Sequence, residues 1–190
     1  MLLQVGGAFG QGQVVMWGAS NFGQTTQQSS SLLGSREVSC GSSHTTVLRL
    51  DGTVFCIGGN IKGQCNVPSG LDSVVQVSSG DDHTMALKSN GQVLVWGDSE
   101  TTQGALGVRQ IPAGLSGVRA IDAGAYNCLA ITSAGEVVAW GTGKTNTGNG
   151  YEFGQSIVPS GLAQVREVRG GKFHTLALRE DGTLVGWGRN

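Results

Sequence analysis

The sequence predicts an all-β fold, a β-propeller of about four to five four-stranded blades, from three observations. Trp-Gly pairs recur along the chain, and Ile57-Gly58 fills the one gap between them. The steps between these positions are 40, 39, 44 and 47 residues by subtraction, a period typical of propeller blades. Asp-Gly or Asn-Gly pairs lie between short apolar runs, and no segment shows sustained helical periodicity. The Trp-Gly pairs begin at Trp17, Trp96, Trp140 and Trp187.

Other features keep the same register. Sixteen residues before each of the last four Trp or Ile positions stands a glycine, and three residues after that glycine comes His or Asn. All three prolines stand five residues after a glycine in one shared frame. Repetition at this many positions predicts one supersecondary unit per period. The glycines are Gly41, Gly80, Gly124 and Gly171, and the residues that follow them are His44, His83, Asn127 and His174.

Each unit is expected to contain four strands in a fixed order. "SVVQVSSG" and its counterparts alternate apolar and polar residues and end in glycine, as an innermost strand would. "LKSNGQVLVWG" then predicts a hairpin, because Asn-Gly and Asp-Gly accept positive φ at both central turn positions. "GQCNVP" and "GQSIVP" predict a short outer strand that stops at proline, which cannot donate to a ladder.

The register divides the single domain 1–190 into a partial blade 1–27 and repeats at approximately 28–58, 59–97, 98–141 and 142–190. The first blade would lack its inner strand and the last its outer strand. The chain then forms either a small, incomplete ring or an open arc whose terminal blades are capped by another chain. We favour the arc, in which uncovered strand edges would invite pairing.

The repeat also predicts structural roles. Trp17, Trp96, Trp140 and Trp187 should lie between neighbouring blades, where a large flat side chain buries most area. The histidines stand in equivalent positions one or more blades apart, so they should hydrogen-bond neighbouring loops rather than converge on a metal. These histidines are His44, His83 and His174.

The motifs Gly-x-x-His-Thr-x-x-Leu, Asp-Gly-x-Val-x-x-Trp-Gly and Gly-Gln-x-x-x-Pro resemble the repeat of the regulator of chromosome condensation family. The "GQCNVPSGL" linker is also similar to bacterial members, including the β-lactamase-inhibitor propeller. The resemblance implies a propeller, usually a ring of seven blades, with one face that binds proteins. It also implies guanine-nucleotide exchange on a small GTPase, although no exchange-specific residue maps onto this chain. Such a resemblance identifies a fold better than a function.

Composition narrows the function classes. Lys plus Arg total 12 and Asp plus Glu total 13, so the basic stripe expected of a nucleic-acid binder is absent. No apolar run approaches the roughly 20 residues that a membrane helix needs. No secretory signal is seen at the N-terminus, which favours an intracellular or organellar location. The four cysteines match neither a zinc site nor a small stapled scaffold, so the redox compartment stays open.

Two motifs that suggest chemistry are better explained by the repeat. Gly143-Lys144-Thr145 ends like a phosphate-binding loop, but Val138 stands where that loop needs glycine and no helix can follow. Ser43, His44 and Asp51 have the residue types of a catalytic triad but lack an elbow or oxyanion signal. We therefore expect no enzyme activity, no cofactor and no metal.

Function is expected in the loops that vary while the frame stays fixed, because aromatic and apolar residues there are typical of interfaces. We expect a non-enzymatic protein-interaction propeller, a scaffold or an accessory subunit of a larger assembly. Alternatives are exchange on a small GTPase, inhibition of an enzyme such as a β-lactamase, and carbohydrate binding; self-association stays open. The candidate partner-binding residues are Asp81, Asp82, Tyr126, Lys172, Phe173, Tyr151, Phe153, Phe22 and Ile61.

Overall fold

The computed structural model describes residues 14–25, 34–98 and 107–190, and every regular element in these residues is a β-strand. Four three-stranded antiparallel sheets, here called blades 1 to 4, follow one another along the chain. Blade 1 contains β1 (Ser35–Cys40), β2 (His44–Arg49) and β3 (Val54–Gly58). Blade 2 contains β4 (Val74–Ser79), β5 (His83–Lys88) and β6 (Val93–Gly97). Blade 3 contains β7 (Val118–Ala123), β8 (Asn127–Thr132) and β9 (Val137–Gly141), and blade 4 contains β12 (Val165–Gly170), β13 (His174–Arg179) and β14 (Leu184–Gly188).

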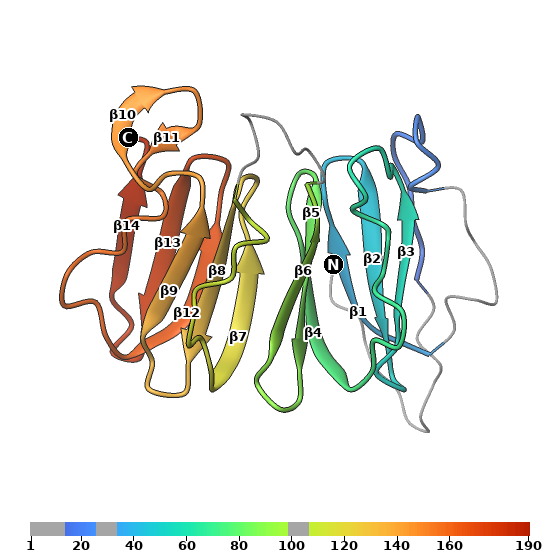
Figure 1. Cartoon of the computed structure of the whole chain (residues 1–190), viewed down its shortest axis with the longest axis horizontal. Helices are drawn as coiled ribbons and strands as arrows, with labels where there is room; N and C mark the ends of the chain where they lie inside the picture. Colours follow the sequence, from blue (N-terminus) through green and yellow to red (C-terminus); the bar gives the residue numbers. More distant parts are fainter. Residues whose placement is uncertain (1–13, 26–33, 99–106) are drawn as a thin grey trace.

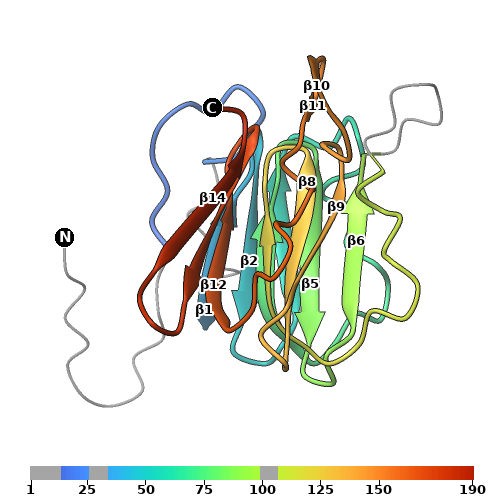
Figure 2. The ribbon, with the colours of Figure 1, turned by 90° about the vertical axis from the view of Figure 1, so that its left-hand side faces the viewer.

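The blades stand side by side in an open arc (Figures 1 and 2). The innermost strand of each blade contacts the innermost strand of the next, β1 with β4, β4 with β7 and β7 with β12. The described residues do not close a ring. The predicted propeller arc is therefore confirmed, with four complete sheets in the described part of the chain.

The sheets have three strands, so the expected fourth strand at residues 63–68 and 154–159 is wrong. The reason is where the linker places its backbone. The carbonyl oxygen of Gln64 accepts hydrogen bonds from Trp96 Nε1 and from Thr84 Oγ1, both at 2.9 Å. Because side chains of the next blade use this carbonyl, the linker lies against that blade instead of adding a strand to a sheet edge.

The hairpin turns also differ from the expected two-residue type. Arg49 N donates to Thr53 O at 2.9 Å and Gly52 N donates to Arg49 O at 3.0 Å, which leaves a three-residue loop. Only the glycine has positive φ, 81° at Gly52. Asp51 instead accepts a hydrogen bond from Thr53 N through its side chain, at 2.9 Å. This geometry is the three-residue hairpin with glycine in the left-handed position.

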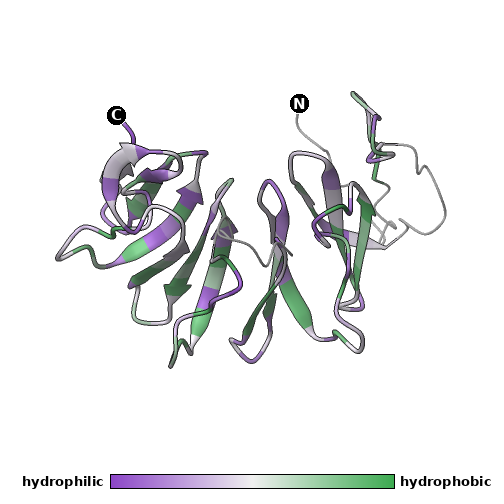
Figure 3. Ribbon diagram, turned by 45° about the horizontal axis from the view of Figure 1, so that its top comes forward, coloured by the Kyte–Doolittle hydropathy of each residue, from purple (hydrophilic) through white to green (hydrophobic). Residues whose placement is uncertain are grey.

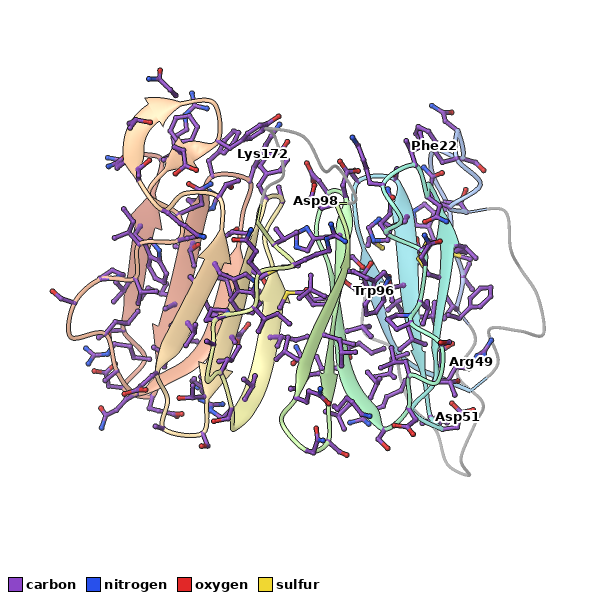
Figure 4. All side chains as sticks on the ribbon, viewed as in Figure 1. Phe22, Arg49, Asp51, Trp96, Asp98 and Lys172 are labelled. Atoms are coloured by element: carbon purple, nitrogen blue, oxygen red, sulfur yellow. A yellow bond between two sulfur atoms is a disulfide. The ribbon has the colours of Figure 1, made fainter. Side chains whose placement is uncertain are left out.

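The core consists of three apolar clusters, one between each pair of neighbouring blades. Hydrophobic residues accordingly concentrate in the strands, while many of the connecting loops are hydrophilic (Figure 3). Trp96 lies between blades 1 and 2 (Figure 4), and Trp140 and Trp187 occupy the equivalent places in the next two clusters. Ile57 stands at the Trp position of blade 1 and is buried as well.

Candidate partner-binding face

The loops between the first and second strand of each blade meet at one end of the arc. Residues 40–42, 79–81, 123–125 and 170–172 line a single pocket of about 400 Å³ at the centre of that end. Hydrogen bonds link the loops in sequence, from Ser42 Oγ to Asp81 O at 2.9 Å, from Asp81 N to Ala125 O at 3.1 Å and from Ala125 N to Gly171 O at 3.1 Å. We call this end, with the neighbouring linker tips, the loop face.

The repeat glycines make this close approach possible. A Cβ atom on Gly80 would meet the ring of His83 and, at 2.6 Å, the carbonyl oxygen of Gly124 in the next blade. A Cβ atom on Gly41 would likewise meet the ring of His44 and the carbonyl oxygen of Gly80. Gly41, Gly80 and Gly124 are therefore required by contact between blades, and the loop after each of them is held in a fixed position.

Four aromatic rings form one cluster on the loop face. The centroid of Tyr126 lies 4.5 Å from that of Tyr151 and 5.7 Å from that of Phe173. The centroid of Phe153 lies 4.8 Å from that of Phe173. The rings come from blade 3, blade 4 and the linker between them, and their tilted packing is the arrangement that aromatic pairs prefer. We call these four residues the aromatic cluster.

Two of these rings are carried by a hairpin in the lengthened linker, formed by β10 (Asn146–Asn149) and β11 (Glu152–Phe153). A Glu152 carboxylate oxygen closes the hairpin by accepting from the Thr145 backbone N at 2.9 Å and the Thr145 hydroxyl at 3.0 Å. At its base, the fully buried Gln155 side chain accepts from Phe153 N at 3.0 Å and donates to Tyr151 O at 2.6 Å. These bonds hold Tyr151 and Phe153 against blade 4.

Cationic side chains border the aromatic cluster. Lys172 Nζ lies 5.5 Å from the centroid of Phe173 and 5.9 Å from that of Tyr126. The Arg189 guanidinium carbon lies 4.9 Å from the centroid of Phe153 and 5.7 Å from that of Phe173. Both are exposed, so each stacked cation adds roughly 0.5–1 kcal/mol and leaves its charge available to a partner.

Two carboxylates, those of Asp81 and Asp82, act electrostatically on Tyr126. Burial, followed by a hydrogen bond with Asp81, raises the pKa of Tyr126 to about 12. Burial also raises the pKa of Asp82, and the charge of Asp81 acts in the same direction. The loop face thus presents aromatic side chains together with nearby cations and carboxylates.

Phe22 and Ile61 form a separate part of the loop face. With Asp82 and Lys62 they line a second pocket of about 310 Å³ beside blades 1 and 2. Their side chains are 52% and 80% exposed. Figure 4 shows Phe22, Asp98 and Lys172 at this end of the arc and Arg49 with Asp51 at the opposite end.

The structure therefore brings together six predicted candidates around the aromatic cluster and places three beside the second pocket. The first group contains Asp81, Tyr126, Tyr151, Phe153, Lys172 and Phe173. The second contains Phe22, Ile61 and Asp82. Arg189 was missed by sequence reasoning, although its position directly after the last Trp-Gly pair, at the loop-face end of β14, was a usable signal.

The repeat histidines differ according to whether another blade follows. His44 Nε2 lies 3.0 Å from Thr84 Oγ1, and His83 Nε2 lies 3.4 Å from Cys128 Sγ, so both join consecutive blades. Burial lowers the pKa of His44 to about 4 and that of His83 to about 3. His174, in the last described blade, is exposed.

The other chemical motifs are placed as follows. Asp51 lies at the end of blade 1 opposite the loop face, so it does not meet Ser43 and His44 (Figure 4). The segment after Gly143-Lys144-Thr145 is strand β10 rather than a helix. Cys56 and Cys65 form a disulfide, although the sequence matched no small stapled scaffold and left the redox compartment open. Within the described residues, no group of three or more His, Cys, Asp or Glu could hold a metal ion, and no helix is long and apolar enough to cross a membrane.

Comparison with known proteins identifies the repeat. The family model for the regulator of chromosome condensation (RCC1) repeat matches residues 36–64, 74–103 and 165–190. Blade 3, in which Asn127 and Cys128 replace the His-Thr pair, lies outside the matched residues. The human regulator of chromosome condensation is 33% identical over 85 residues, which cover 38% of this chain and 20% of that protein.

Solved structures show the same fold over most of the chain. Human WBSCR16 is 25% identical with a TM-score of 0.63, over 82% of this chain and 48% of that one. The ectodomain of the Physcomitrella patens receptor kinase CR4 is 25% identical with a TM-score of 0.60, over 81% and 40%. Yeast RCC1 (Prp20), bound to Kap60, is 20% identical with a TM-score of 0.59, over 80% and 43%. The chain thus spans less than half the length of these propellers and about a fifth of the curated relative.

Proposed function

The chain carries repeats of the regulator of chromosome condensation family, and from this premise we propose that it is a non-enzymatic propeller segment that binds a protein through its loop face. The observation that supports this most is the aromatic cluster. Interface hot spots are enriched in aromatic and arginine side chains placed at the centre of a contact. Four rings from two blades and an inserted hairpin converge here, with Arg189 and Lys172 beside them.

The rigid support of the cluster strengthens this proposal. Gln155 and Glu152 fix the hairpin, and the hydrogen-bonded loops fix Tyr126 and Phe173. Side chains already held in place lose little conformational freedom on binding, which favours affinity. The central pocket and the second pocket extend the face across all four blades, so a partner could contact it over a broad area.

The test compares variants at the two ends of the arc. The tagged chain is recovered from its native source, and proteins that accompany it are identified for the wild type, a Tyr126→Ala/Phe173→Ala variant and an Asp51→Ala control. We expect a partner that the wild type and the control retain and the double variant loses. A partner retained equally by all three, or lost equally from both variants, would count against the loop face.

A second candidate is nucleotide exchange on a small GTPase, which the similarity to the human regulator favours. A solved structure of yeast Prp20p is described together with its binding to Gsp1p and histones, and that protein is 21% identical to this chain. Nucleotide release from a panel of small GTPases is the direct measurement. Accelerated release that Tyr126→Ala abolishes would favour exchange, and an unchanged rate across the panel would remove it.

A further inference from the structure

One residue of the repeat joins consecutive blades through a buried hydrogen bond. His44 Nε2 lies 3.0 Å from Thr84 Oγ1 between blades 1 and 2, and His83 Nε2 lies 3.4 Å from Cys128 Sγ between blades 2 and 3. Asn127 is the equivalent residue of blade 3, because it opens β8 as His44 opens β2 and His83 opens β5. The junction between blades 3 and 4 therefore has a carboxamide where the other two junctions have an imidazole.

Asn127 makes no such bond. Its side chain is fully buried, yet neither Nδ2 nor Oδ1 has a hydrogen-bond partner among the described residues. His44 and His83 each lack a partner only at Nδ1 and keep their bridge through Nε2. A buried amide with both polar atoms unpaired is destabilising, and such groups in folded proteins are nearly always satisfied by protein atoms or by ordered water.

The length of the side chain explains why the direct bond is not made. The far nitrogen of an imidazole is one bond further from Cβ than the nitrogen of a carboxamide, so an asparagine at this position ends short of the next blade. Thr175 of blade 4 corresponds to Thr84 and is also fully buried. It donates its hydroxyl proton to Gln155 O at 2.9 Å, so its oxygen can serve this junction only as an acceptor.

We infer that one buried water molecule joins Asn127 to Thr175 between blades 3 and 4. A water in the plane of a primary amide can accept from the N–H and donate to the carbonyl oxygen at once, because the syn hydrogen and the oxygen lone pair point the same way. Its second proton is donated to Thr175 Oγ1, which gives the water about three hydrogen bonds, the usual number for an internal water. The volume by which an imidazole exceeds a carboxamide is close to that of one water molecule, about 30 Å³.

The water joins the two strands whose preceding loops carry part of the aromatic cluster. Tyr126 immediately precedes Asn127 at the start of β8, and Phe173 immediately precedes β13, which contains Thr175. The centroids of the two rings lie 5.7 Å apart across this junction. The bridging water is therefore part of the framework that sets the spacing of Tyr126 and Phe173.

The test counts internal water molecules in matched variants. Magnetic relaxation dispersion of the water oxygen nucleus counts the long-lived waters in solution, and a crystal structure of the wild type locates them. Asn127→His should hold one fewer long-lived water than the wild type, because the imidazole reaches Thr175 directly. His44→Asn should hold one more, because it creates the same short side chain between blades 1 and 2. Asn90→His is the control at an exposed turn position and should leave the count unchanged.

The crystal structure should show an ordered water within hydrogen-bond distance of the Asn127 amide and of Thr175 Oγ1. No water at that position, or a count that Asn127→His leaves unchanged, would overturn the inference. A count that His44→Asn leaves unchanged would also contradict it, because the shorter side chain would then not admit water. The wild-type structure decides by itself if a variant fails to fold, and none of these outcomes depends on partner binding at the loop face.

Discussion

His44 Nε2 lies 3.0 Å from Thr84 Oγ1, so a single buried hydrogen bond joins the second strand of blade 1 to that of blade 2. Thr84 in turn donates its hydroxyl proton to Gln64 O at 2.9 Å. Because Thr84 has one hydroxyl proton and gives it to Gln64 O, His44 Nε2–H donates to Thr84 Oγ1, and the buried Nδ1 carries no proton in the neutral ring. His44 and His83 are therefore structural residues, and their protonation would place a charge inside the buried contact between blades.

Acid should destabilise the protein through His44 and His83. Their folded pKa values are about 4 and about 3, below the unfolded value of 6.5, so the unfolded chain binds more protons between these limits. Stability contributed by the neutral rings is complete above pH 6.5 and falls as the pH drops toward 4. For His44 the full loss is roughly 3 kcal/mol. Urea unfolding between pH 7 and pH 4 measures it.

His44→Asn is the control for that measurement, because Asn127 occupies the equivalent position in blade 3 and does not titrate. The variant should show a smaller decrease in the free energy of unfolding between pH 6.5 and pH 4 than the wild type. Carboxyl groups with raised pKa values, such as Glu37, are the same in both proteins and cancel in the comparison. Equal pH slopes would contradict the buried neutral histidine.

Gly80→Ala should destabilise the fold by about 2 kcal/mol or more, because its Cβ would meet the ring of His83 and the carbonyl oxygen of Gly124. Gly186→Ala is the matched comparison, since its Cβ would approach the Leu176 side chain at 3.0 Å and meet the Thr175 carbonyl oxygen at an ordinary contact distance of 3.8 Å. The free energies of unfolding of the two variants provide the measurement. Similar values for both would show that the loops are looser than the structure indicates.

Trp140→Ala should lower the free energy of unfolding by about 3–5 kcal/mol, since the indole is buried and donates to Val108 O at 2.6 Å. Trp17→Ala should change it by less than about 0.5 kcal/mol at concentrations where the chain is monomeric. Chemical denaturation of dilute samples tests both. A large loss for Trp17→Ala under these conditions would mean that the side chain packs within its own chain.

Replacing Cys56 and Cys65 by serine should cost about 2–3 kcal/mol, because the disulfide closes a loop with a sequence separation of 9. It ties the linker after β3 back to that strand. A thiol assay under denaturing conditions should count two free thiols in the oxidised protein, from Cys40 and Cys128, and four after reduction. Four thiols without reductant would exclude the disulfide.

The repeat period was sufficient to predict the arc of sheets and the Trp side chains between blades, because burial in this fold recurs with the same period. Trp17 shows the limit of that reasoning, because it stands at the same repeat position as the buried Trp140 and is nevertheless 84% exposed. The number of strands per blade could not be predicted, because Gln64 O bonds to Trp96 and Thr84 rather than to a strand. Nothing in the spacing of Cys56 and Cys65 indicated that the linker turn brings them together.

The candidate site was predictable in part for a similar reason. Tyr126 and Phe173 occupy equivalent loop positions in adjacent blades, so their proximity follows from the repeat. The contact of Phe153 with Arg189 does not, since it depends on how the inserted hairpin folds back over blade 4.

That hairpin begins and ends beside the same buried glutamine. Gln155 Nε2 donates to Thr142 Oγ1 at 3.1 Å, and the backbone carbonyl oxygen of Gln155 accepts from Trp187 Nε1 at 2.9 Å. The backbone carbonyl oxygen of Gln64 accepts from Trp96 Nε1 in the same way in a shorter linker. The residues from 144 to 153 can therefore change in length and composition while the framework stays intact. Such an arrangement lets selection alter recognition by exchanging one short insert, and it makes the same insert a natural graft site for an engineered binding loop.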